Sequence, residues 1–138
     1  MIGSFLAKIK KYRNLRNDPF LPLGIDAILV IPGTVGADFI LDCEVVPYAD
    51  VWKRTTKLVR NALPAAEKAG VTICIENVWN KFLLSPLEMK QFVEQFDSTR
   101  VGVYFDVGNA LGLGYPEHWI PVLGDRIKRV HFKDYRVN

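Results

Sequence analysis

The sequence predicts an α/β protein built around a parallel sheet. Four short apolar runs alternate with longer segments of helical spacing, in the order strand, helix, strand, helix, strand, helix, strand. The second and third runs are almost continuously apolar, which is typical of parallel strands covered on both faces. No glycine-rich dinucleotide fingerprint and no phosphate-loop pattern follows a strand. That absence weakens the usual open doubly wound folds, although periodicity alone does not separate an open sheet from a barrel.

The expected strands are short and are bounded by glycine, proline or an acidic residue. Gly24 precedes the first run and Pro32 stops it, while Gly70 precedes the second and Asp106 stops the third. The four runs are Ile25–Ile31, Val71–Ile75, Val101–Phe105 and Ile127–Phe132.

Three helices are expected between these strands. Pro47 begins the first, in which Pro64 should introduce a kink or divide the helix in two. Ser85 and Glu88 form a capping box at the start of the second. The third runs from Pro116 to Leu123 and ends at Gly124. The residues expected to face the core are Val51, Thr55, Leu58, Val59, Ala62, Ala66 and Ala69 in the first helix, and Leu87, Phe92, Val93 and Phe96 in the second, with Trp52 and Trp119 also in the core.

Length and charge limit the function classes. The chain has 138 residues, whereas a complete (β/α)₈ barrel typically needs about 250. The net charge of +3 comes from the first sixteen residues, which hold five of the 18 Lys and Arg side chains. We expect residues 1–22 to be a basic tail or frayed helix, and residues 23–138 to be one near-neutral domain. This distribution argues against a nucleic-acid-binding surface across the fold.

Cysteine usage and hydropathy indicate a cytoplasmic setting. Cys43 and Cys74 are two separate cysteines without metal-finger spacing, which suits a reducing compartment. No run approaches the roughly 18 apolar residues of a membrane span. The charged first residues contain no apolar segment of the kind that a secretory signal needs.

Ionisable residues stand where three consecutive strands finish. Glu76 follows the second run, Asp106 follows the third and His131 lies near the end of the fourth. Because the carboxyl ends of parallel strands open onto one face, we expect the three side chains to converge. Two carboxylates suit Mg²⁺ and Mn²⁺, and the imidazole also admits Co²⁺ or Zn²⁺. Each residue also has a purely structural interpretation, as a turn residue, a helix cap or a hydrogen-bonded strand end.

The residues around these positions resemble the xylose-isomerase-like TIM barrels. The resemblance rests on three segments, which read VTICIENVWN from Val71, YFDVGN from Tyr104 and RVHFKD from Arg129. Within that superfamily the chain resembles the sugar phosphate isomerases and epimerases, including hexulose-6-phosphate isomerases and L-xylulose-5-phosphate 3-epimerases of carbohydrate metabolism. The resemblance covers about residues 23–136. It implies that the four strands are the fourth to seventh of an incomplete parallel (β/α) barrel.

The resemblance implies a set of metal ligands and a mechanism. Glu76, Asp106 and His131 match the family's first three ligands, with Glu76 also acting as a catalytic base. The implied reaction is metal-dependent isomerisation or epimerisation of a ketose or ketose phosphate through an enediolate. The family's second catalytic Glu, after the eighth strand, has no counterpart in this chain. The sequence therefore leaves open an inactive, truncated family member, and below it an AP endonuclease of the same fold, which would need more histidines than His118 and His131.

Four further residues are candidates for substrate binding. Many family members carry a substrate-binding His where this chain has Asn109, which keeps only hydrogen bonding. Trp79, with Lys81, follows Glu76 on the same loop and could contact substrate or pack a lid. Lys133 and Arg136 suit a phosphate group, and are equally well explained as solvated surface charges.

A four-stranded parallel sheet leaves two edges without a partner strand. Unpaired edges promote aggregation unless something covers them. We therefore expect two copies of the chain to associate as a homo-oligomer, with a small-molecule sugar or sugar phosphate as the ligand and no membrane partner. A monomer in light scattering at high concentration would argue against this association.

Overall fold

The computed structural model describes residues 24–134, so the basic segment 1–22 and Arg136 lie outside the described residues. The strands are β1 (Ala27–Val30), β2 (Thr72–Glu76), β3 (Val101–Asp106) and β4 (Ile127–His131). The helices are α2 (Tyr48–Ala69), α3 (Pro86–Glu94), α4 (Val107–Leu111) and α5 (Pro116–Leu123), followed by a 3₁₀ turn at Gly124–Arg126.

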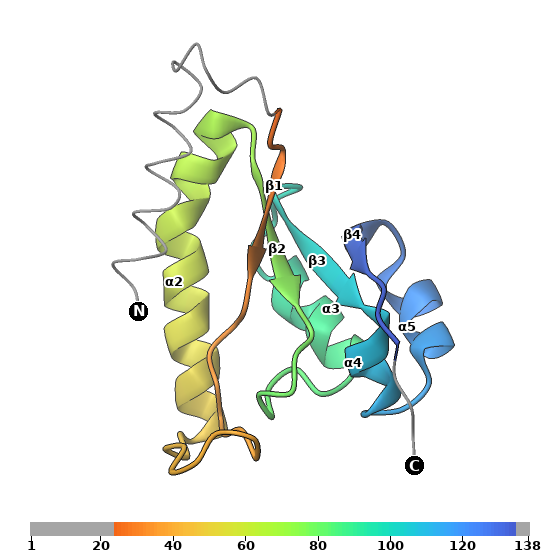
Figure 1. The fold of residues 1–138 in the computed structure, drawn as a ribbon. Helices are drawn as coiled ribbons and strands as arrows, with labels where there is room; N and C mark the ends of the chain where they lie inside the picture. The colour runs from red at the N-terminus through yellow and green to blue at the C-terminus, as the bar shows by residue number, and fades with distance from the viewer. Residues whose placement is uncertain (1–23, 135–138) are drawn as a thin grey trace.

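The four strands form one parallel sheet in the order β1-β2-β3-β4 (Figure 1). Strands β2, β3 and β4 each follow a helical connection, so the predicted α/β alternation is confirmed. Strands β1 and β4 are shorter than the predicted runs. Strand β2 is shifted by one residue and β3 is one residue longer, because they extend into Glu76 and Asp106. The β3–β4 pairing contains an irregularity at Val103 and Tyr104, after which Asp106 pairs with His131.

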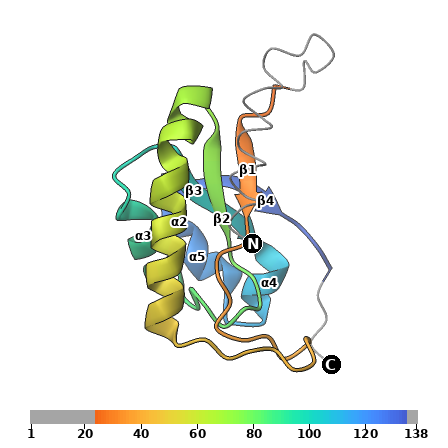
Figure 2. The same ribbon diagram turned by 90° about the vertical axis from the view of Figure 1, so that its left-hand side faces the viewer.

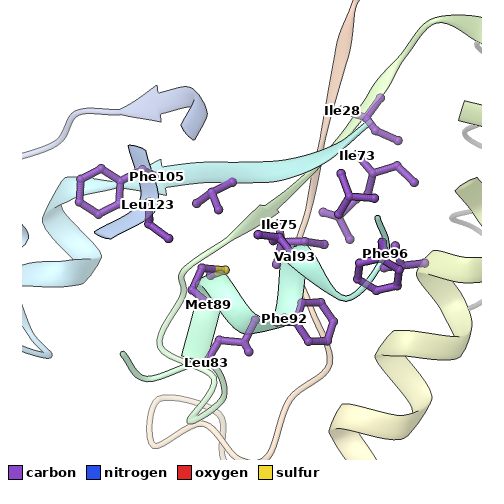
Figure 3. Packing of buried hydrophobic residues seen from close by; sticks show 14 of the residues in the cluster. Ile28, Ile73, Ile75, Leu83, Met89, Phe92, Val93, Phe96, Phe105 and Leu123 are labelled. Atoms are coloured by element: carbon purple, nitrogen blue, oxygen red, sulfur yellow. The ribbon is translucent and has the colours of Figure 1, made fainter. Parts of the chain in front are cut away.

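The apolar core lies between the sheet and its helices. Figure 2 shows α2 and α3 together on one side of the sheet. In the close-up of Figure 3, Ile75 of β2 lies beside Val93 and Met89 of α3. Phe105 of β3 stacks on Trp119 of α5, with ring centroids 5.8 Å apart. Burial of these side chains holds the helices on one face of the sheet.

Helix α2 contains Pro64 and remains one helix of 22 residues, so of the two expected effects of Pro64, a kink or a division, the division does not occur. Pro64 is exposed, and water can therefore reach the carbonyl of residue 60 that loses its helical partner. Buried residues continue on both sides of the proline, and this packing holds the helix together. They are Val51, Thr55, Val59, Ala62, Ala66 and Ala69.

Helix α3 begins as predicted and buries Phe92 and Val93 as expected, but Leu87 is not part of its buried stripe. The Ser85 Oγ accepts a hydrogen bond from the Glu88 N–H at 3.2 Å, and Glu88 Oε2 accepts from the Leu84 N–H at 2.8 Å. Leu87 was expected in the core and is 70% exposed, whereas Met89 is fully buried. Phe92 lies five positions after Leu87, which places the two side chains about 140° apart around the helix. Leu87 therefore faces solvent when Phe92 faces the core.

Helix α5 has the predicted bounds, and Gly124 follows it with a φ of 51°. Its Trp119 is buried, while Trp52 of α2 is only partly buried against the core. The short helix α4 was not predicted. It begins directly after β3, with Asp106 as its N-cap. Among the described residues, no helix combines the length and the apolar character that crossing a membrane would require.

Candidate metal centre

Three ionisable side chains end three neighbouring strands. Glu76, Asp106 and His131 are the last residues of β2, β3 and β4. Parallel pairing brings these ends to the same rim of the sheet, where Asp106 is directly paired with His131. Figure 1 shows helix α4 and the loop after β2 at this end of the sheet.

The three side chains meet at one point on that rim. One donor atom from each residue can be chosen so that all three lie within 4.8 Å of one another. The His131 Nδ1 is 2.8 Å from Glu76 Oε1 and 3.9 Å from Asp106 Oδ2. The side chains of Glu76 and Asp106 are only 8% and 4% exposed, while that of His131 is 45% exposed. The predicted convergence is therefore present, with two oxygens and one nitrogen directed at a shared space.

Asp106 has a different task for each carboxylate oxygen. Its Oδ1 accepts a hydrogen bond from the Asn109 N–H at 2.8 Å and so caps helix α4. Its Oδ2 faces His131 and Lys133. The structural interpretation of Asp106 as a helix cap and its interpretation as a ligand therefore apply to different atoms of the same side chain.

Asn77 is a residue of the site that sequence reasoning did not single out. Its side-chain amide donates to the Asp106 carbonyl and accepts from the Asp106 N–H, each at 2.8 Å. The Asn109 side chain donates to the Asn77 carbonyl at 2.8 Å. Asn77 is 1% exposed, so these are buried bonds that fix the backbone carrying Asp106. Its position directly after Glu76, at a strand end, was the available signal.

The predicted substrate-binding residues Trp79, Asn109 and Lys133 form one cluster beside Asp106. The Trp79 indole N–H donates to the Asn109 carbonyl at 3.2 Å. The Lys133 Nζ lies 2.5 Å from Asn109 Oδ1, 3.0 Å from Asp106 Oδ2 and 5.2 Å from the centroid of the Trp79 ring. Lys81 instead pairs with Asp38 at 2.5 Å. Lys133 is thus engaged with a candidate ligand, which its interpretation as a purely solvated charge did not anticipate.

Two further polar features lie away from the rim: an ion pair between Arg129, in the middle of β4, and Asp26, just before β1, and the thiol of Cys74, in the middle of β2. Arg129 donates to Asp26, and this bond lowers the pKa of the Asp26 carboxyl and raises that of the guanidinium. Cys74 is fully buried, and burial raises the pKa of its thiol to about 11. At neutral pH this thiol is protonated, so Cys74 behaves as a small apolar side chain.

A loop after β1 adjoins the loop after β2. Its neck is closed by a hydrogen bond from the Val46 N–H to the Val35 carbonyl at 2.9 Å. Asn80 anchors it, since its side chain donates to the Gly33 carbonyl at 2.8 Å and its carbonyl accepts from Val35 and Gly36. A cavity of about 360 Å³ lies within this region, between residues 35–45 and Lys81, and none of the three candidate ligands lines it.

Comparison with known proteins finds a matching family and several similar structures. The model of a family described as xylose isomerase-like TIM barrel matches residues 22–138. A xylose isomerase domain protein from Planctomyces limnophilus is 19% identical with a TM-score of 0.64, and the match covers 94% of this chain and 41% of that one. A D-psicose 3-epimerase solved in the presence of D-fructose is 18% identical with a TM-score of 0.71, over 94% and 43% of the two chains.

A third similar structure is the IOLI protein with a binding zinc atom, which is 15% identical with a TM-score of 0.60 over 83% of this chain and 36% of that one. No curated protein matches the sequence. At these identities the likeness shows the fold alone. The chain spans about two fifths of the length of the first two structures, 41% and 43%.

Proposed function

We propose that this chain, which belongs to the xylose isomerase-like TIM barrel family, carries the metal-binding part of an isomerase or epimerase acting on a ketose or ketose phosphate. One observation carries the proposal. Glu76, Asp106 and His131, from three successive strands, bring donor atoms within 4.8 Å of one another at the rim where barrel enzymes hold their substrates.

The donor set fits a divalent cation. Two carboxylate oxygens and one imidazole nitrogen suit Mn²⁺, Mg²⁺, Co²⁺ or Zn²⁺. Both carboxylates are buried, at 6% exposure for Glu76 and 3% for Asp106, and a cation offsets the cost of burying their charge. Glu76, Asp106 and His131 would hold the ion, and the ion would polarise the carbonyl of the ketose.

Glu76 is the proposed base. Its carboxylate is almost inaccessible to water yet lies at the mouth of the cluster, with His131 Nδ1 at 2.8 Å. A carboxylate held in this way can take the proton from the carbon next to the carbonyl, leaving an enediolate, and can return it. Trp79, Asn109 and Lys133 are the proposed substrate contacts, because all three flank Asp106. Arg136, the fourth, lies outside the described residues.

A single base has a stereochemical consequence. Among residues 24–134, no carboxylate other than Glu76 and Asp106 belongs to the cluster. A proton removed by Glu76 therefore returns to the same face of the substrate. We expect this chain, loaded with Mn²⁺, to exchange that proton with solvent without inverting the carbon.

The test is deuterium uptake in D₂O, followed by NMR. The chain is incubated with Mn²⁺ and either an unphosphorylated ketohexose or a ketopentose phosphate, which separates the two substrate classes. We expect deuterium at the carbon beside the carbonyl, retained configuration, and loss of uptake in Glu76→Gln. Absence of uptake from both sugars by the metal-loaded protein would support the rival function.

That rival is a family member without catalysis, favoured by the absence of a second glutamate from the cluster that the described residues form. The nuclease alternative is disfavoured because His118 lies on α5 beside Tyr115, and among the described residues only His131 brings an imidazole to the site. The homo-oligomer remains a proposal, in which a second copy would pair with the edge strands β1 and β4.

A further inference from the structure

The ammonium group of Lys133 lies against a proposed metal ligand. Its Nζ is 3.0 Å from Asp106 Oδ2, and the Asp106 side chain is 4% exposed. A lysine at this distance from a carboxylate forms a charge-assisted hydrogen bond, which is stronger than a neutral one. Lys133 therefore neutralises part of the charge that a metal ion would need.

The contact involves the oxygen that a metal would use. Asp106 Oδ1 is occupied in capping helix α4, where it accepts from the Asn109 N–H. Asp106 Oδ2 is the atom that faces the cluster, 3.9 Å from His131 Nδ1. The cation and the ammonium group would consequently share one oxygen.

We propose that Lys133 is a positioning residue that competes with the divalent cation for Asp106 Oδ2 and so weakens metal binding. This inference rests on the metal site of the proposed function. It assigns to Lys133 a role toward the metal, in addition to any contact with substrate.

The surroundings of Lys133 keep its charge near the site. Its aliphatic stem crosses Gly108 so closely that a Cβ at that position would lie 2.5 Å from the Lys133 Cγ. Its ammonium group also contacts Asn109 Oδ1 at 2.5 Å and lies over the Trp79 ring. These contacts hold the side chain from both sides, so arrival of a metal does not send the ammonium group freely into solvent.

The charges at the site give the expected direction of the effect of Lys133 on metal affinity. Glu76 and Asp106 together carry two negative charges, which a divalent cation would neutralise with a neutral His131. Lys133 adds a positive charge that repels the incoming ion and stabilises Asp106 without it. The Lys133 side chain is 42% exposed, so water screens part of this repulsion.

The test is isothermal titration of the chain with Mn²⁺. Lys133→Met removes the positive charge that contacts Asp106, so it should tighten Mn²⁺ binding by about tenfold or more. Lys81→Met removes the same charge from the neighbouring loop, where the ammonium group pairs with Asp38, and should change affinity by less than about threefold. Lys133→Arg keeps the charge and should bind Mn²⁺ as weakly as the unmodified chain. Circular dichroism establishes that each variant is folded.

The outcomes separate this inference from the proposed function. Unchanged or weaker Mn²⁺ binding by Lys133→Met, with binding still lost in Asp106→Asn, would overturn the competition and leave the metal site intact. Equal tightening in the Lys81 variant would replace competition by a general effect of net charge. Absence of Mn²⁺ binding from all folded variants would overturn both proposals.

Discussion

The inner strands and the edge strand of the sheet contribute to the site in different ways. Glu76 and Asp106 end β2 and β3, each of which has a strand on both sides, and their side chains are 8% and 4% exposed. His131 ends β4, which has a partner on one side among the described residues, and its side chain is 45% exposed. The site therefore combines a buried carboxylate pair with an imidazole on an accessible edge.

The carboxylate side is fixed by hydrogen bonds that do not involve a metal. The Asn77 amide holds the Asp106 backbone from β2, and the Asn109 N–H holds Asp106 Oδ1. The edge side is more exposed: the His131 ring is tilted against Tyr104 with centroids 4.4 Å apart, its Nδ1 is 2.8 Å from Glu76 Oε1, and the Lys133 side chain is 42% exposed. Hydrogen bonds within the protein therefore hold Asp106 in place, whereas the imidazole of His131 is the more exposed side chain of the proposed site.

The largest effect on stability should come from removing the Asn77 side-chain amide, which holds the Asp106 backbone. Asn77→Ala leaves a buried N–H and a buried carbonyl of Asp106 without the Asn77 amide, at about 1 to 3 kcal/mol each, so the free energy of unfolding should fall by about 2 to 6 kcal/mol. Urea denaturation measures it. Asn61→Ala, at an exposed position of α2, is the control and should have little effect. A loss below about 1 kcal/mol for Asn77→Ala would mean that the amide does not brace Asp106.

A smaller effect on stability tests how tightly the inner strand β3 and the edge strand β4 are packed. Val103 of β3 is fully buried, whereas Val130 of β4 is 39% exposed. Val103→Ala should lower the unfolding free energy by about 2 to 3 kcal/mol through lost burial and a residual cavity. The matched change Val130→Ala should lower it by about 0.5 kcal/mol. Equal losses in urea denaturation would show that β4 is covered in solution, as pairing with a second copy would require.

The outline of the fold was predictable because apolar runs and helical spacing report burial directly. The four strands, the capping box at Ser85 and the bounds of α5 follow from that signal. Local rules were insufficient where they compete with packing. Pro64 does not break α2, because the helix buries residues on both sides of it, and Leu87 points outward because of its angular position.

The convergence of the three proposed ligands was predictable from the sequence because the carboxyl ends of the strands meet at one rim of any parallel sheet. Its supporting contacts were not, since the bonds between Asn77 and Asp106 join residues 29 positions apart and depend on side-chain direction. The contact of Lys133 with Asp106 depends in the same way on the path of the chain after β4 and on the absence of a side chain at Gly108. The spacing of these residues in the sequence reveals neither the bonds of Asn77 nor the contact of Lys133.

The most direct test of the metal centre is the melting temperature with and without Mn²⁺. A ligand that binds only the folded state adds about 2.7 kcal/mol of stability at a hundredfold excess over its Kd, so the melting temperature should rise measurably. Glu76→Gln and Asp106→Asn keep the shape of each side chain, and each should abolish the rise. A rise that persists in both variants would contradict the assignment of Glu76, Asp106 and His131 to one metal site.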